Sequence, residues 1–186
     1  MGAIAIPAPT GGWNASDSLD RMPATDAVRL VNWIPRAGFV QSRPGFVPHV
    51  SGLGGSVESL MAWRGPSGDK LLAGANGNIW DVTTTTPTSL GTGFAANDWN
   101  STNHTGRLIL CNGVSTPQVY NGTTITNMVA TGPTLTTLWG ANTFKGRAFY
   151  WARNAQSFWY AAAGSFQGTL TEFKLDAQLT TGGSLV

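Results

Sequence analysis

The sequence predicts an all-β protein in which an extended, proline-rich N-terminal arm precedes repeating units of about 40 residues. Three observations predict this class. Glycine (24) and tryptophan (8) are abundant, whereas charged residues make up 11% against roughly 25% in an ordinary globular domain. Aromatic residues recur at a fixed spacing after residue 57, and prolines crowd the first 50 residues. Many short strands joined by tight turns fit this composition, because glycine accepts a positive φ and flat side chains pack on a pleated sheet.

Residues 1–56 are predicted to form the arm. Its prolines, at positions 7, 9, 23, 35, 44 and 48, exclude long helices and central strands. One short helical turn is expected from Thr25 or Asp26 towards Trp33, since either residue can cap a helix. Apolar side chains in an extended segment need cover, so we expect the arm to act in assembly. The residues expected to make its contacts are Trp13, Arg21, Trp33, Arg36, Arg43 and Phe46. The arginines spaced along it, Arg21, Arg29, Arg36 and Arg43, are expected to position it on a neighbouring subunit.

Residues 57–186 are predicted to repeat. Three aromatic residues stand 40 positions apart: Trp80, Tyr120 and Tyr160. Three tryptophans recur at spacings of 36 and 40: Trp63, Trp99 and Trp139. Arg107 and Arg147 are again 40 apart. Short aromatic strands in a unit of about 40 residues are typical of a β-propeller blade, so we expect the six aromatic residues to pack between blades.

The blades are predicted at 57–97, 98–137 and 138–169, with the start of a further blade at 170–186. Each full blade contains a predicted hairpin: 71–73 with 79–82, 108–111 with 118–120, and 149–152 with 157–161. Asn76-Gly77 and Asn121-Gly122 are expected in tight turns, because both residue types tolerate a positive φ. Three blades are fewer than the usual four to eight. A partial propeller therefore follows, either truncated from a longer parent, which we favour, or completed by another chain, or left as an open sheet.

Charge and motifs exclude several function classes. The excess of 11 Lys+Arg over 9 Asp+Glu is small and dispersed, so no phosphate-gripping surface is expected. No nucleophile elbow, phosphate-binding loop or set of ligands at metal spacing occurs. We therefore expect no catalytic residue, cofactor or metal, and no enzyme activity. His49 and His104 are interpreted as polar loop residues and Cys111 as a core residue. Without a secretory signal or an apolar span of about 18 residues, synthesis in a cytoplasm is expected.

Parts of the arm resemble the N-terminal signature of tail-nozzle or tail-hub (head–tail stabilisation) proteins of short-tailed bacteriophages. The most telling residues are Asn32-Trp33-Ile34-Pro35 and Arg43-Pro44-Gly45-Phe46, preceded by Gly11-Gly12-Trp13-Asn14. The segment 173–186 is similar to a mid-protein segment of that family. The resemblance implies a virion protein, assembled in the host bacterial cytoplasm as a homo-oligomeric ring, commonly a hexamer. Its partners would be the connector, other tail proteins and double-stranded DNA in transit, with no membrane.

Alternatives remain at this stage. Three arginines could face a channel and touch DNA, or could be solvated or paired with carboxylates: Arg107, Arg147 and Arg153. A carbohydrate-binding or carbohydrate-active propeller is the first rival to a structural role, because exposed tryptophans stack on sugars. The tryptophans in question are Trp99, Trp139, Trp151 and Trp159. A scaffold propeller that binds cellular peptides is the second rival, and it would be an isolated monomer.

Overall fold

The computed structural model describes residues 7–176, 178 and 185. The chain divides into two compact units, Met1–Pro48 and His49–Val186. Apart from one 3₁₀ turn, η1 (Leu135–Thr137), the regular secondary structure of the described residues is β-strand. The all-β class predicted from the sequence is confirmed.

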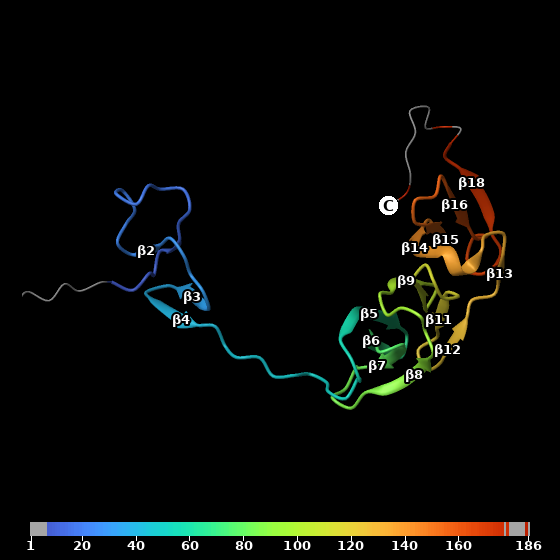
Figure 1. The fold of residues 1–186 in the computed structure, drawn as a ribbon, viewed down its shortest axis with the longest axis horizontal. Helices are drawn as coiled ribbons and strands as arrows, with labels where there is room; N and C mark the ends of the chain where they lie inside the picture. Colours follow the sequence, from blue (N-terminus) through green and yellow to red (C-terminus); the bar gives the residue numbers. More distant parts are fainter. Residues whose placement is uncertain (1–6, 177, 179–184, 186) are drawn as a thin grey trace, which may run out of the picture. The chain divides into compact units, whose positions relative to one another are not determined.

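The first unit contains two small sheets (Figure 1). β1 (Gly12–Trp13) pairs in parallel with β2 (Asp26–Ala27), and β3 (Trp33–Arg36) forms an antiparallel hairpin with β4 (Phe39–Ser42). Asn14 closes the long connection from β1 to β2, because its side-chain amide donates to Asp17 Oδ2 and to Asp26 Oδ2, both at 2.8 Å. The helical turn predicted from Thr25 or Asp26 is wrong. Asp26 lies in β2 instead, and its carboxylate accepts from Asn14 rather than capping a helix.

The second unit contains three four-stranded antiparallel sheets that follow one another along the chain (Figure 1). The first sheet comprises β5 (Val57–Gly65), β6 (Gly68–Ala75), β7 (Asn78–Asp81) and β8 (Thr88–Thr92). The second comprises β9 (Asn100–His104), β10 (Arg107–Cys111), β11 (Gln118–Tyr120) and β12 (Ile125–Asn127). The third comprises β14 (Leu138–Phe144), β15 (Arg147–Ala152), β16 (Ser157–Tyr160) and β18 (Thr171–Lys174). Strands are hydrogen-bonded in chain order in each, and no sheet closes within the described residues.

The three predicted hairpins are confirmed as the pairs β6–β7, β10–β11 and β15–β16. Asn76 and Gly77 form the first turn with φ of 51° and 70°, the positive values that make a tight turn between twisted strands. The turns between the first two strands of the second and third sheets are also equivalent. Thr105-Gly106 has φ of 45° and 73°, and Lys145-Gly146, 40 residues later, has 46° and 72°.

The end of the third sheet differs from the predicted boundary. The sequence analysis begins a further blade at residue 170, but β18 pairs with β16 and completes the third sheet. Leu170 is buried in the core of that sheet, and the Phe173 ring stacks on Phe158 with centroids 5.0 Å apart. These two contacts hold the segment on the preceding strands. A short parallel pair, β13 (Ala130–Thr131) with β17 (Gly168–Thr169), ties the same region to the entry of the third sheet. The remainder of the predicted blade, 177, 179–184 and 186, lies outside the described residues.

The core of the second unit lies between the sheets, and β10 is its centre. Leu108 and Leu110 belong to a cluster shared with the first sheet, whereas Ile109 and Cys111 belong to a cluster shared with the third. All four side chains are fully buried. Because successive side chains point to opposite faces of a strand, the continuous apolar run of β10 shows that both faces of the second sheet are covered.

Candidate functional site

The first strands of the three sheets lie side by side, β5 next to β9 and β9 next to β14. Side chains, rather than a backbone ladder, join them. Asn103 in β9 donates from Nδ2 to Ala62 O at 2.8 Å and accepts at Oδ1 from Arg64 N at 2.9 Å. In the next pair, Thr143 Oγ1 donates to Asn103 O at 3.3 Å. We call these strands and their bridging side chains the edge ladder.

The edge ladder continues at the opposite ends of the same strands. Asn97 Nδ2 donates to Glu58 Oε1 at 3.0 Å, Ser59 Oγ donates to Asn97 O, and Asn100 Nδ2 donates to Trp139 O at 3.1 Å. Partners in the ladder stand 38 to 41 positions apart. The 40-residue period of the sequence therefore matches the sequence separation between hydrogen-bonded residues on neighbouring sheets.

The close approach of the first two sheets requires a glycine. A Cβ at Gly74 would lie 2.4 Å from Asn97 O and 2.6 Å from Ser59 Oγ. Both atoms belong to the edge ladder, so a side chain at this position would push it apart.

Three of the six predicted packing residues meet between the first and second sheets: Trp63, Trp99 and Tyr120. The Trp63 indole is buried, donates from Nε1 to Gly106 O at 3.1 Å, and meets the Tyr120 ring edge-on with centroids 5.6 Å apart. Trp99 is also buried and meets Phe94 edge-on at 5.1 Å. The Trp63–Tyr120 contact joins the first strand of the first sheet to the third strand of the second, and the Phe94–Trp99 contact lies in the connection between β8 and β9.

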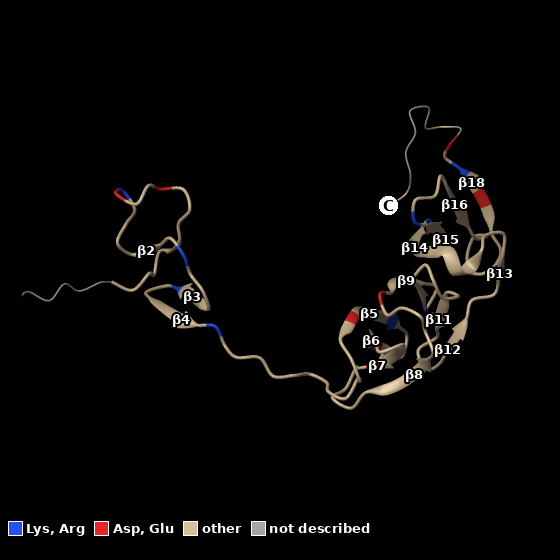
Figure 2. Ribbon diagram, in the orientation of Figure 1, with Lys and Arg blue, Asp and Glu red and all other residues tan. Residues whose placement is uncertain are grey.

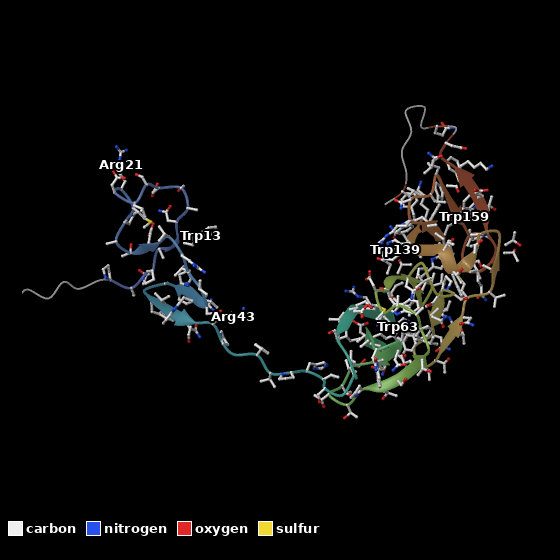
Figure 3. The ribbon with its side chains drawn as sticks, in the orientation of Figure 1. Trp13, Arg21, Arg43, Trp63, Trp139 and Trp159 are labelled. Atoms are coloured by element: carbon white, nitrogen blue, oxygen red, sulfur yellow. The ribbon has the colours of Figure 1, made fainter. Side chains whose placement is uncertain are left out.

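The other three lie elsewhere: Trp80, Trp139 and Tyr160. Trp80 packs on the face of the first sheet that is turned away from the second. Trp139, half-buried near the start of β14, has its ring against Gly113 in the connection after β10, so it does pack between sheets, the second and the third. The Arg153 guanidinium lies 3.5 Å from its ring centre. Figure 3 labels Trp63 and Trp139 at these separate places in the second unit.

A difference of one residue in strand pairing explains Tyr160. Tyr120 pairs with Leu108, but Tyr160 pairs with Phe149, not with Ala148, which stands 40 residues after Leu108. Ala161 donates its N–H to Ala148 O and occupies the position equivalent to Tyr120. The connection from β15 to β16 is thus one residue longer, and Tyr160 points to the opposite face of its sheet.

The third sheet presents an aromatic face on the side away from the second sheet. We define the aromatic face by five residues: Phe149, Trp151, Phe158, Tyr160 and Phe173. The Phe149 and Phe158 rings lie 5.9 Å apart, and Phe173 is 43% exposed. A cavity of about 320 Å³ opens on this face, lined by Phe149, Trp151, Phe158 and Leu185. Phe149, Trp151, Phe158 and Tyr160 are half-buried, so this face is apolar and partly open to solvent in the described part of the chain.

The first sheet has an apolar face on the side turned away from the second sheet. The sequence analysis extends the arm to residue 56, but residues 49–53 belong to the second unit and partly cover this face. His49 Nε2 donates to Val82 O at 2.8 Å, and Leu53 is buried against Ala73 and Val82. A hollow of about 350 Å³ remains, and we call it the first-sheet hollow. It is lined by His49, Val50, Leu53, Val57, Leu60, Leu71, Ala73 and Val82.

The candidate DNA-contacting arginines do not form one patch. Arg107 and Arg147 begin β10 and β15 beside equivalent turns, and Arg107 lines a polar cavity between the first two sheets. Arg147 donates to Ala161 O at 3.3 Å and lies over the Tyr160 ring. Arg153 follows the other end of β15 and covers Trp139. Figure 2 shows how widely the charged residues are scattered along the ribbon.

The predicted contact residues of the arm are largely exposed within the first unit (Figure 3). Trp13 is 69% exposed, Trp33 54% and Phe46 85%. The Trp13 indole nevertheless has a fixed orientation, because Nε1 donates to Val28 O at 3.0 Å. Among the described residues, no ion pair involves an arginine of this unit, namely Arg21, Arg29, Arg36 and Arg43. Of these arginines, Arg29 lies next to the two exposed tryptophans, since it lines one cavity with Trp13 and another with Trp33.

Burial contributes to each resolved pKa shift in the second unit. Burial raises the pKa of the Cys111 thiol to about 12, so the nucleophilic thiolate is not formed at neutral pH. Burial, followed by Cys111, raises the pKa of Tyr150, whose hydroxyl donates to Phe166 O. Burial also acts on Asp81, but hydrogen bonds from Thr83 and Lys70 oppose it and lower the pKa overall. His104 is not the loop residue expected from the sequence; it ends β9, is buried, and has Nδ1 3.2 Å from Thr143 Oγ1.

In residues 7–176, 178 and 185, no group of three His, Cys, Asp or Glu side chains is placed to hold a metal ion. That same part of the chain has no helix long and apolar enough to span a membrane. No protein-family model matches the sequence, and no curated protein matches it.

Proposed function

We propose that this protein is a structural subunit of a bacteriophage tail, part of the nozzle or hub ring below the head–tail connector through which DNA leaves. In this proposal the three sheets are three blades of a partial β-propeller, and the first unit is the arm that contacts neighbouring subunits. The observation that carries the propeller part is the edge ladder, which repeats one sheet-to-sheet contact at the sequence period. The tail part rests on the resemblance of Asn32-Trp33-Ile34-Pro35 and Arg43-Pro44-Gly45-Phe46 to the tail-nozzle signature.

The sheet geometry supports the propeller part. Propeller blades are four-stranded antiparallel sheets arranged around an axis. Here three such sheets follow one another, and their first strands adjoin. Apolar clusters fill the space between successive sheets, as expected of repeats that bury their faces only against neighbours.

The exposed surfaces support the structural part. A free monomer gains solubility from charge, yet charged residues make up 11% of this chain. The aromatic face and the exposed aromatic rings of the first unit leave large apolar side chains in contact with water. Assembly would cover both. In a ring, Arg107 and Arg147 share one rim of the sheets, where they would meet DNA phosphates weakly enough to allow passage.

The proposal is tested by the mass of the full chain at micromolar concentration, measured by light scattering after gel filtration. We expect a ring of several subunits, with a central channel visible by negative-stain electron microscopy. A chain that remains monomeric across concentrations would contradict the structural role and favour a scaffold propeller.

A carbohydrate-binding propeller is the second candidate, and Trp151 on the aromatic face is the observation that favours it. Sugars need hydrogen-bonding groups beside the stacking ring. The cavity beside Trp151 is lined by Phe149, Phe158 and Leu185, none of which offers a polar side chain. Trp99 is buried between sheets, so it cannot stack on a sugar. Binding on a glycan array that is lost in Trp151→Ala would establish this alternative.

A further inference from the structure

We propose that the aromatic face of the third sheet binds the first-sheet hollow of a second copy of this chain. The sheets of two copies then stack as the sheets within one copy do. This inference rests on the assembly role proposed above and names both the partner and the contact.

The contact extends packing that the chain already contains. We call the side of a sheet that is turned towards the next sheet along the chain its later face, and the other side its earlier face. The later face of the first sheet carries Met61, Trp63 and Ile79. It packs on the earlier face of the second sheet, which carries Leu108 and Tyr120. The later face of the second sheet packs on the earlier face of the third in the same way. The aromatic face is the later face of the third sheet, and the first-sheet hollow is on the earlier face of the first. Joining them repeats the same order across two copies.

The two surfaces differ in shape. The aromatic face presents large rings: Phe158 stacks on Phe173 and lies beside Phe149. The first-sheet hollow has a floor of small and branched side chains, Ala73 and Val82, and a wall at Leu60. Its volume of about 350 Å³ falls in the range of roughly 300–1,000 Å³ that binds large apolar groups.

Exposure marks both surfaces as incompletely covered. Leu60 is 65% exposed and Val57 46%, although residues 49–53 cover the rest of that face. On the aromatic face, Phe149, Trp151 and Phe158 are half-buried. Leu185 is the described residue that reaches these rings from outside the sheet, held by hydrogen bonds with Asn154 and Ala155.

The symmetry of the contact predicts its product. A contact between two different surfaces closes into a ring when its rotation allows. The described residues of each chain form three four-stranded sheets in this order, and the contact places the third sheet of one copy against the first sheet of the next. The expected product is a closed ring of copies in which each copy uses both surfaces.

The test compares two variants of the full chain by analytical ultracentrifugation. Phe158→Asp charges the aromatic face, and Leu60→Asp charges the first-sheet hollow. We expect each to weaken self-association about 30-fold or more, as loss of a central apolar anchor does. Val129→Asp is the control, because Val129 is 72% exposed and lies between β12 and β13, outside both surfaces. It should leave the association constant unchanged. Near-UV circular dichroism checks that each variant is folded.

Mixing the two variants gives the sharpest result. Phe158→Asp keeps an intact hollow and Leu60→Asp keeps an intact aromatic face, so an equimolar mixture should recover one contact and form an open pair. Association that Leu60→Asp leaves intact, or that the mixture fails to recover, overturns the proposal. Rings that persist in both variants would overturn this contact but keep the ring subunit. Closed pairs that never form larger rings would keep the contact but remove the nozzle ring.

Discussion

In the second and third sheets, the turns between the first two strands have the same geometry and lie 40 residues apart. The second strands, β10 and β15, nevertheless differ in how far they are buried. In β10 the run Leu108–Cys111 is buried throughout, whereas in β15 only alternate residues, Ala148 and Tyr150, are fully buried. Phe149 and Trp151 alternate with these two residues and belong to the aromatic face. Among the described residues, the second sheet has a neighbouring sheet on each face, and the third has one on a single face.

Some features of a sheet depend on the residues of its own 40-residue unit, and others depend on where that unit lies in the chain. Turn, pairing order and edge ladder recur because they depend on residues within one 40-residue unit. Burial depends on whether another sheet follows. The open face of the third sheet is more aromatic than the matching face of the second, which carries Ile109, Cys111 and Val119. Such rings are more common in protein interfaces than at a water-exposed surface.

The largest expected effect comes from emptying the covered interface. Trp63→Ala removes a buried indole, its hydrogen bond to Gly106 and its contact with Tyr120. We expect the free energy of unfolding to fall by about 3–5 kcal/mol, measured by urea denaturation. Trp151→Ala on the aromatic face is the matched comparison; because its indole is half-buried against Gly140, we expect a smaller loss of about 1–2 kcal/mol. Equal costs for the two tryptophans would contradict the contrast between covered and open sheets.

Sequence reasoning found the fold class and the period because both are written in local patterns. The three hairpins follow from apolar runs separated by turn residues, and the 40-residue spacing follows from recurring aromatic side chains. The period alone did not reveal its physical cause. The residues that join the sheets, such as Asn103 and Thr143, are ordinary polar residues of a Thr- and Asn-rich chain, and only their partners show what they do.

Where the structure differs from the sequence-based predictions, the causes are also local. Tyr160 has the right spacing but the wrong face, because a connection longer by one residue exchanges the two faces of a strand. Asp26 was a reasonable helix cap by residue type, but Asn14, twelve positions earlier, holds it in β2. The aromatic face could not be predicted from the sequence, because its residues come from three strands. No single strand contributes more than two of them.

A smaller effect should sharpen the account of the edge ladder. Asn103→Ala removes the acceptor for Arg64 N and the donor to Ala62 O. We expect a loss of about 1–2 kcal/mol in the free energy of unfolding, since two hydrogen bonds at an exposed edge are lost. Asn142→Ala is the control, because the Asn142 side chain accepts only from the adjacent Thr143 N. If the two alanine variants were equally stable, the bridges of Asn103 would contribute nothing to sheet packing.

The smallest effect concerns the buried end of β9. Burial lowers the pKa of the His104 imidazole from its ordinary value of 6.5, and the Ser165 backbone opposes this by less. Below that ordinary value the unfolded chain binds a proton that the folded chain resists, so acid favours unfolding. The free energy of unfolding should therefore fall as the pH drops from about 7 to about 5, above the range where most carboxylates titrate. Urea denaturation at each pH measures this slope.

His104→Asn isolates that group from the other titrating residues. The asparagine amide can still reach Thr143 Oγ1, which lies 3.2 Å from His104 Nδ1, but it takes up no proton between those pH values. The variant should lose most of the slope while keeping the sheet contact. A wild-type curve that is flat over this range, or a variant with the same slope, would show that the contact between the second and third sheets tolerates a charged imidazole. The buried surface there would then be less closed than the one at Trp63.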